Sequence, residues 1–190
     1  MENALLVSSS EKDTSLYTGF LSAASIHQIA SAQSCESARK ILLKQDFDLI
    51  IVDSPLGDES GESFSRHTAA KGVSQVMLLV DSGLFSSVSA ACEDYGVLTI
   101  SKPLNRELFW SALSLAKSVQ NRVKRIQAEN AQLKQKIEDI RIIDRAKCLL
   151  ISIMQMSEQE AHRYIEKQAM DIRSTKRIVA EGILKQYENY

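Results

Sequence analysis

Two residues at the ends of apolar segments could form a charged switch site. Asp53 ends the run 48-DLIIVD-53, and Lys102 follows the run 97-VLTIS-101 and precedes Pro103. A carboxylate at the end of a buried strand can accept a phosphoryl group when a divalent cation neutralises the phosphate oxygens. The same carboxylate can instead form a structural ion pair with a lysine. The residues around Asp53 decide between these two interpretations.

The elements that position Asp53 belong to an α/β pattern. Residues 1–103 alternate apolar runs with segments of helical length, such as 34–45 and 83–96. Nearly continuous apolar runs are typical of strands that are buried on both faces. Alternating strands and helices predict a flavodoxin-like, five-stranded parallel sheet with helices on both faces. We expect its strands at residues 4–9, 26–30, 48–53, 76–80 and 97–101.

The pattern changes after Pro103, where a long helix is expected. From Asn105 to about Gln155 the sequence contains neither Pro nor Gly. Apolar residues then recur at steps of four and three, with one Asn at a core position, which favours a parallel two-stranded coiled coil. The alternative is one long helix packed on its own chain. The residues of the predicted homodimer seam are Val119, Val123, Ile126, Asn130, Leu133, Ile137 and Ile140.

The last segment predicts two short helices that complete a three-helix unit. Ser157 followed by Glu160 is a capping box that opens the first of them. Ser174 is expected to cap the second. Ala161 and Ala169 fall on one face at helical spacing, so we expect them in tight helix packing.

Charge is distributed unevenly along the chain, although the formal net charge is only −1. Residues 1–116 carry 8 Lys and Arg against 14 Asp and Glu, whereas residues 117–147 carry 9 against 4. Residues 148–190 carry 6 of each. Basic residues gathered at one end favour phosphate contact. The alternative is a solvated helix face.

Several classes of protein are disfavoured by composition. Cys35, Cys92 and Cys148 are scattered without a C-x-x-C pair, which predicts reduced thiols in the cytoplasm. No apolar run approaches the length of a membrane span. His27 and His67, like His162, have no metal ligands at suitable spacing, and no nucleophile motif is present. We therefore expect a cytoplasmic protein that is not an enzyme and holds no metal.

The C-terminal residues are similar to an ANTAR domain, a three-helix RNA-binding module of bacterial transcription antiterminators. The stretch 141-RIIDRAKCLLISIMQMSEQEAHRYIEKQAMDIRSTKRIVAEGIL-184 supplies the Ala-Lys, Ser-x-x-Glu-Ala, Ala-Met and Val-Ala elements of the family pattern. It departs at Cys148, where the family usually has Gly, and at Ile151, where it usually has Met. The resemblance, together with the charge pattern, predicts RNA contacts by Arg141, Arg145, Lys147, Arg173, Lys176 and Arg177.

The N-terminal residues resemble the receiver domain of two-component response regulators, which has the flavodoxin-like (CheY-like) fold. Asp53 matches the phosphoacceptor, and Lys102-Pro103 matches the lysine and proline after the last strand. The acidic metal-binding pair of the family falls on Ser8 and Ser9, and its Ser/Thr after strand four falls on Asp81 or, one position on, on Ser82. Neutral hydroxyls are poor Mg²⁺ ligands. We therefore expect a pseudo-receiver without Mg²⁺, in which Asp53 and Lys102 form a structural pair.

These resemblances predict three parts and one main function. The parts are a pseudo-receiver at 1–116, a coiled-coil dimerisation linker at 117–140 and an ANTAR domain at 141–190. The implied function is antitermination by binding hairpin loops in leader RNA, without conventional phosphorylation. The resemblance suggests a nitrogen-utilisation operon as its target. The alternative is a protein-interaction or sequestration module in which RNA binding is lost or secondary and a regulatory protein is the partner.

Overall fold

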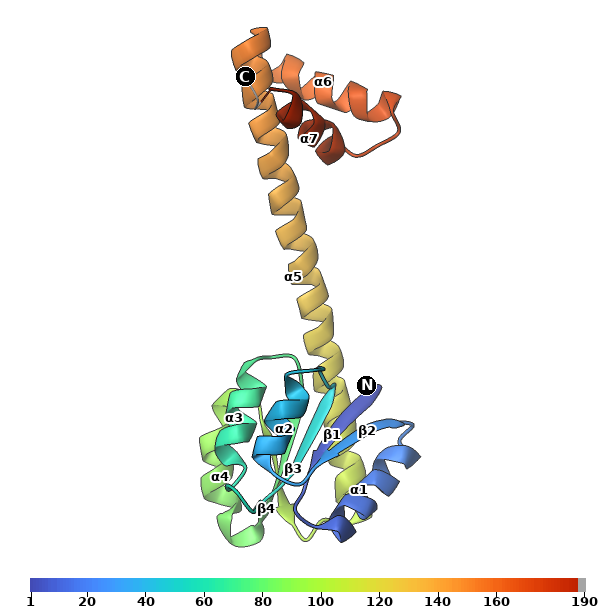
Figure 1. The fold of residues 1–190 in the computed structure, drawn as a ribbon, viewed down its shortest axis with the longest axis vertical. Coiled ribbons are helices and arrows are strands. Elements are labelled where there is room, and N and C mark those ends of the chain that lie inside the picture. The colour runs from blue at the N-terminus through green and yellow to red at the C-terminus, as the bar shows by residue number, and fades with distance from the viewer. Residues whose placement is uncertain (188–190) are drawn as a thin grey trace. The chain divides into compact units, whose positions relative to one another are not determined.

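The computed structural model describes residues 1–187, and its N-terminal part is built around a five-stranded parallel sheet (Figure 1). The strand order is β2-β1-β3-β4-β5. The five predicted strands and the predicted parallel sheet are confirmed, with ends that shift by one to a few residues. The strands are β1 (Asn3–Val7), β2 (Gln28–Ala32), β3 (Leu49–Asp53), β4 (Gln75–Asp81) and β5 (Leu98–Lys102).

Helices cover both faces of this sheet and bury its alternating side chains. One face packs on α1 (Glu11–Ala23) and the first turns of α5 (Arg106–Met154). The other face packs on α2 (Cys35–Leu42), α3 (Glu62–Ala70) and α4 (Phe85–Cys92). Two short 3₁₀ segments, η1 (Ser82–Leu84) and η2 (Glu93–Tyr95), flank α4. β3 is buried over its whole length, as its continuous apolar sequence predicts.

The turns of this domain use the residues that their backbone angles require. Gly96 follows η2 with φ of 73°, the left-handed conformation in which glycine commonly ends a helical segment. Gly61 precedes α3 with φ of 80°, and a Cβ built there would lie 2.8 Å from Cγ1 of Val52. Any side chain at position 61 would therefore collide with the buried strand β3.

The long helix α5 runs from Arg106 to Met154, as the absence of Pro and Gly predicts. The Asn105 side chain accepts a hydrogen bond from the N–H of Leu108 at 2.7 Å and so caps its start. Its first turns bury Phe109 and Ala116 against the sheet. Gln120 is 2% exposed and donates to the carbonyl of Val73. Beyond this point the helix no longer belongs to the core of the sheet domain.

The last part of α5 packs with α6 (Glu158–Asp171) and α7 (Lys176–Tyr187) as a three-helix unit. The predicted capping box is confirmed, because Ser157 and Glu160 bond each other's backbone N–H. The prediction that Ser174 caps the next helix is wrong. Thr175, one position later, accepts from the N–H of Ile178 at 3.3 Å. The core contains four alanines, which lets the helices approach closely: Ala146, Ala161, Ala169 and Ala180.

The chain divides into two compact units, Met1–Arg125 and the residues from Ile126 onward. The predicted boundaries at 116/117 and 140/141 lie within α5 on either side of this division. Among residues 1–187, no helix is both long enough and apolar enough to cross a membrane.

Candidate functional site

The side chain of Asp53 lies at the carboxyl end of β3 and is held by two neighbours from adjoining strand ends. Asp53 is 6% exposed. The hydroxyl of Ser8, just after β1, donates to Oδ2 of Asp53 at 2.9 Å. Nζ of Lys102, at the end of β5, lies 3.2 Å from Oδ1. Both carboxylate oxygens of Asp53 therefore already have a donor from the protein itself.

Lys102 binds a second carboxylate at the same strand edge. Asp81 and Lys102 are register partners on β4 and β5, and their side-chain charges lie 3.4 Å apart. The lysine also donates to the backbone carbonyl of Ser54. The side chain of Asp81 is 61% exposed, whereas that of Asp53 is 8% exposed. The single ammonium group of Lys102 thus neutralises part of the charge of two aspartates.

The residues around Asp53 do not fit an Mg²⁺ site. Mg²⁺ takes hard oxygen ligands, preferably carboxylates, in a near-octahedral arrangement. Ser8 is 1% exposed and its hydroxyl donates to Asp53, while Ser9 is exposed. Within residues 1–187, the group of three side chains close enough to share an ion is Cys35, Asp58 and Glu59, which does not include Asp53.

That group has a structural explanation. The carboxylate of Asp58 accepts hydrogen bonds from the backbone N–H groups of Cys35 and Glu36 at the start of α2. Burial, reinforced by Glu59 and Asp58, raises the pKa of the Cys35 thiol to about 12. The thiol therefore stays protonated at neutral pH, whereas a metal ligand must be a thiolate.

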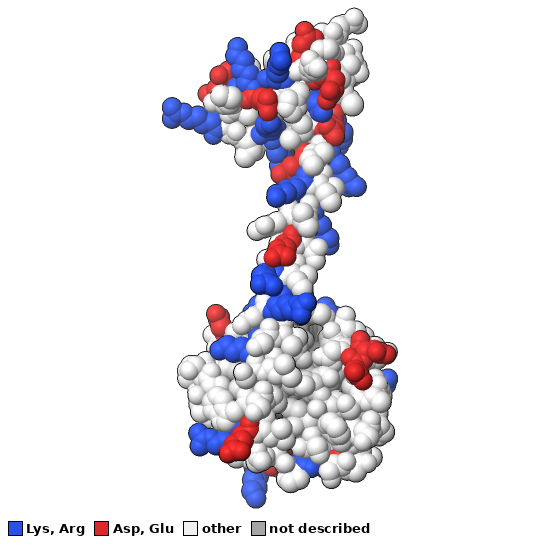
Figure 2. Space-filling model, turned by 180° about the vertical axis from the view of Figure 1, so that it is seen from behind, with Lys and Arg blue, Asp and Glu red and all other residues white. Residues whose placement is uncertain are grey.

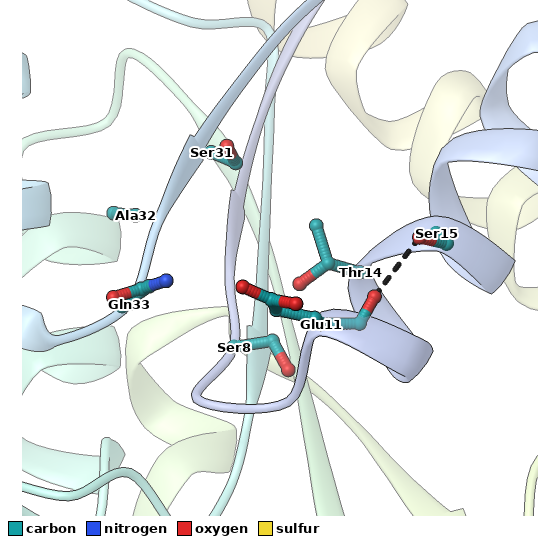
Figure 3. A pocket seen from close by; sticks show the side chains of 7 residues that line it. All are labelled: Ser8, Glu11, Thr14, Ser15, Ser31, Ala32 and Gln33. Carbon is teal, nitrogen blue, oxygen red and sulfur yellow. Dashed lines mark hydrogen bonds between the residues drawn. The ribbon is translucent and has the colours of Figure 1, made fainter.

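A polar hollow of about 300 Å³ lies beside this edge, between α1 and the ends of β1 and β2 (Figure 3). Its one carboxylate belongs to Glu11, which lies in the first turn of α1. Ser8 is the residue that this hollow shares with the surroundings of Asp53. The hydroxyl of Ser8 donates to Asp53.

Four of the six predicted RNA-contacting cations make ion pairs inside the C-terminal unit, and the pair of Arg141 is the longest of them. Lys147 lies 2.8 Å from Asp144 and 3.1 Å from Glu158, and these contacts raise its pKa. Its side chain is only 16% exposed. An approaching phosphate would have to displace carboxylates that Lys147 already binds.

The cations of α7 connect its first turn to the other two helices. Lys176 pairs with Glu166 of α6. Arg177 lies 2.7 Å from Asp139 of α5 and 2.8 Å from Glu181. Contacts with Asp139 and Glu181 raise the pKa of Arg177. Both cations therefore have a structural role in addition to the RNA contact predicted for them.

Arg141 and Arg145 lie beside a hollow, and Arg173 lies in an exposed turn. Arg141 and Arg145 line a hollow of about 500 Å³ on α5, whose apolar part includes Leu149 and Leu184. The ion pair of Arg141 with Glu138 is long, at 3.8 Å. Arg173 is exposed in the turn between α6 and α7, with φ of 51°. Figure 2 shows Lys and Arg side chains interspersed with Asp and Glu on this C-terminal unit.

The predicted coiled-coil seam is exposed along the middle of α5. The large apolar side chains at its positions are 40% to 58% exposed, although such residues are usually buried. Val123 is half-buried, and Asn130 is exposed. These residues are not covered by any part of the same chain that the structure describes. The exposed apolar members are Val119, Ile126, Leu133, Ile137 and Ile140.

A second hollow in the C-terminal unit includes Arg163 and Lys167, which are not among the predicted RNA contacts, and Tyr164, which the sequence allows either to stack on a base or to pack in the core. It has a volume of about 450 Å³ and lies at the corner between α5 and α6. Tyr164, Arg163 and Lys167 contribute from α6, and Met154 contributes from the end of α5. The available signal was the spacing of Arg163 and Lys167, four residues apart on either side of an aromatic residue.

Known proteins resemble each of the two parts. Residues 131–184 match the ANTAR domain family. The transcriptional regulatory protein PdtaR of Mycobacterium tuberculosis is 28% identical over 138 residues, which cover 73% of this chain and 67% of that protein.

Solved structures resemble the sheet domain. The receiver domain of a putative Luxo repressor protein from Vibrio parahaemolyticus has a TM-score of 0.57 and 20% identity, covering 67% of this chain and 95% of that one. The response regulator TrrA from Thermotoga maritima, solved with Mg²⁺-BeF, has a TM-score of 0.52 and 21% identity, covering 61% and 99%. The protein thus joins a domain with the receiver fold to a C-terminal segment that matches the ANTAR domain family.

Proposed function

We propose that the protein is a transcriptional regulator that binds RNA through its ANTAR domain and acts as an antiterminator. The observation that carries this proposal is the match of residues 131–184 to the ANTAR family. The similarity to PdtaR, which is named as a transcriptional regulatory protein, supports it. Each ANTAR unit would hold a hairpin loop in nascent leader RNA and favour that hairpin over a terminator stem. Such a regulator acts in the cytoplasm and is not an enzyme.

The open cations of the C-terminal unit support contact with an RNA backbone. Hairpin loops present unstacked bases and a backbone that basic side chains can hold. Arg141 and Arg145 line an open hollow, and Arg173 is exposed in a turn. Lys147, Lys176 and Arg177 can join them by exchanging a carboxylate partner for a phosphate. We rank the first three as the stronger candidates.

A homodimer is the second part of the proposal. The exposed apolar stripe on α5 has the four-three spacing of a coiled coil, and it includes Asn130 at a core position. A parallel dimer would cover Leu133 and Ile137, which are 56% and 52% exposed. It would also present two ANTAR units, which suits an RNA with two hairpins.

Control without conventional phosphorylation is the third part. The donors from Ser8 and Lys102 already engage Asp53, and the pair of acidic residues that a Mg²⁺ ion requires is replaced by Ser8 and Ser9. Asp81 adds negative charge where a phosphoryl group would arrive. We therefore propose that the domain holds no Mg²⁺ cofactor and works as a fixed docking domain.

RNA binding is tested by titrating the purified protein with an RNA that carries tandem hairpins from its own operon leader, over a series of salt concentrations. We expect tight binding that weakens as salt increases, and weaker binding by Arg141→Gln/Arg145→Gln. The double variant should reduce the slope of log K against log salt by about 1.4 to 1.8, since each lost phosphate contact removes about 0.7 to 0.9. The matched control is Lys117→Gln/Arg122→Gln, which removes two exposed cations of α5 in the N-terminal unit.

Phosphorylation is tested separately by incubating the protein with acetyl phosphate and Mg²⁺ and measuring the intact mass. We expect no phosphorylated species. A phosphorylated species that disappears in Asp53→Asn would contradict the pseudo-receiver proposal without affecting the RNA-binding proposal.

A second candidate function is a protein-interaction module. The ion pairs of Lys147, Lys176 and Arg177 favour it, because they reduce the positive charge available to RNA. Binding to the leader RNA no tighter than to an unrelated RNA, with the dimer intact, would select this alternative. For the main proposal, a nitrogen-utilisation operon is the first target to examine, since regulators resembling this chain often control nitrogen sources.

A further inference from the structure

The hollow at the corner of α5 and α6 has an unusual combination of side chains for a small helical unit. Met154 is 44% exposed at the end of α5, and Tyr164 is 36% exposed on α6. Met156 also lines the hollow, which has a volume of about 450 Å³. This volume lies within the range of pockets that bind small molecules. One aromatic ring and flexible thioether side chains thus line an open, mostly apolar surface.

The unit does not need Tyr164 for its own core. The adjacent Ile165 is 0% exposed and packs with Ala161 in the centre of the three helices. Tyr164 is one position away on α6 and so lies about 100° around the helix from Ile165. The structure gives Tyr164 no hydrogen bond to any of residues 1–187. Tyr164 is 36% exposed, so its ring can contact a partner while the rest of the residue packs on the unit.

The charges around the hollow favour an anionic partner. Neither Arg163 nor Lys167 makes an ion pair with a residue that the structure describes, in contrast to the paired Lys147 and Lys176. Glu160 also lines the hollow. Hydrogen bonds from the backbone and hydroxyl of Ser157 lower the pKa of Glu160, so it is anionic and engaged in the helix cap. Two cations against one capped carboxylate leave the hollow positive.

We propose that this hollow is a nucleobase-binding subsite, in which an unpaired base of the RNA stacks on Tyr164 beside Met154. Arg163 and Lys167, one helical turn apart, contact the phosphates on either side of that base. Aromatic rings bind unstacked bases in this way without needing a particular sequence, and nearby cations hold the backbone. The inference rests on the RNA-binding function proposed above, and it adds Arg163 and Lys167 to the RNA contacts predicted from the sequence.

The test combines protein variants with abasic RNA in the titration of tandem-hairpin leader RNA. Tyr164→Ala should weaken binding roughly tenfold to a hundredfold, the usual effect of losing one stacked base. Tyr164→Phe should bind like the original protein, since stacking does not need the hydroxyl. Removing one particular loop base should weaken binding by a similar factor in the original protein and have little further effect in Tyr164→Ala.

Controls separate this subsite from general effects on folding and charge. Tyr95→Ala removes a tyrosine that is 46% exposed in the other unit, and it should not change RNA affinity. Arg163→Gln/Lys167→Gln should reduce the salt dependence without removing the effect of the abasic position. Thermal unfolding of each variant identifies any loss of the fold, and in that case Tyr164→Leu replaces Tyr164→Ala.

The possible failures are distinguishable. If the original protein does not bind the leader RNA, the proposed function itself fails. If the original protein binds the RNA but Tyr164→Ala binds it equally well, the nucleobase subsite is refuted while RNA binding stands. The same holds if, at every abasic position, the loss of affinity is as large in Tyr164→Ala as in the original protein. Unchanged RNA affinity together with loss of a protein partner from Tyr164→Ala would make the hollow a protein-docking surface and would also overturn the inference.

Discussion

Shortening two side chains of the apolar stripe on α5 should dissociate the proposed dimer. Leu133 and Ile137 are 56% and 52% exposed in the single chain, so a partner helix can bury about half of each. Full burial of such a side chain contributes about 1.5 to 3 kcal/mol, so half-burial contributes roughly 0.8 to 1.6. A dimer contains two such residues on each of its two chains, so Leu133→Ala/Ile137→Ala should weaken its association free energy by about 3 to 6 kcal/mol. This loss raises the dissociation constant about 10² to 10⁴-fold.

Sedimentation equilibrium over a range of protein concentrations measures this change directly. The original protein should be dimeric at micromolar concentration, and the double variant should be largely monomeric. Leu43→Ala is the matched control, because Leu43 is 85% exposed but lies outside the stripe. The reasoning is refuted if the original protein is a monomer at all accessible concentrations, or if the double variant associates as tightly as Leu43→Ala. Asn130→Ile adds a second arm: it should tighten association and broaden the oligomers formed, since a core Asn selects the two-stranded register.

Three further predictions concern stability and reactivity. Ser157→Ala should lower the free energy of unfolding of the C-terminal unit by about 1 kcal/mol, because it removes the capping box of α6, and chemical denaturation will measure the loss. At pH 8 a thiol reagent should modify the exposed Cys148 quickly. Cys35 and Cys92 should react only on unfolding, because both are buried and burial raises the pKa of both thiols. Equal labelling of all three cysteines in the native protein would contradict this prediction. Burial alone would raise the pKa of Asp48, but hydrogen bonds from Lys124 and the N–H of Glu2 hold it below its ordinary value. The stability that ionised Asp48 contributes is therefore fully present above the unfolded pKa of about 3.9, and it is lost as pH falls through the lower folded pKa. Asp48→Asn should lower the free energy of unfolding by about 1 to 2 kcal/mol at pH 7 and by little near pH 2.

The elements of the fold could be predicted because their signals are local. A continuous apolar run such as 48-DLIIVD-53 specifies a buried strand without reference to the rest of the chain. The absence of Pro and Gly gave the bounds of α5 to within one residue. The residue that caps the start of α7 cannot be assigned from the sequence, because Ser174 and Thr175 are both good capping residues. Only the geometry of the turn shows that Thr175 makes the bond.

The candidate RNA surface could be predicted less well, because a count of charges does not show which charges are paired. Besides the local partners Asp144 and Glu181, the carboxylates that bind Lys147, Lys176 and Arg177 lie 11, 10 and 38 positions away in the sequence. Only the packing of the three helices brings these pairs together. The basic character of residues 117–147 therefore overstates the positive charge available to a phosphate. The unpaired cations Arg163 and Lys167 lie in a segment whose net charge is zero, so the charge pattern gave no reason to select them.

The carboxyl edge of the sheet keeps the aspartate and lysine of a receiver-like site but differs in the residues around them. Asp53 and Lys102 remain together at the strand ends, so the fold positions the same two groups that a phosphorylated switch needs. The changes are in what surrounds them: a serine hydroxyl donates to Asp53, and Asp81 shares the lysine. A phosphoryl group on Asp53 would bring more negative charge to a site where two carboxylates already depend on one ammonium group. Because a divalent cation usually balances that charge, we propose that a site with serines in place of the metal ligands keeps one state, and that control acts through the proposed dimer seam or a bound partner.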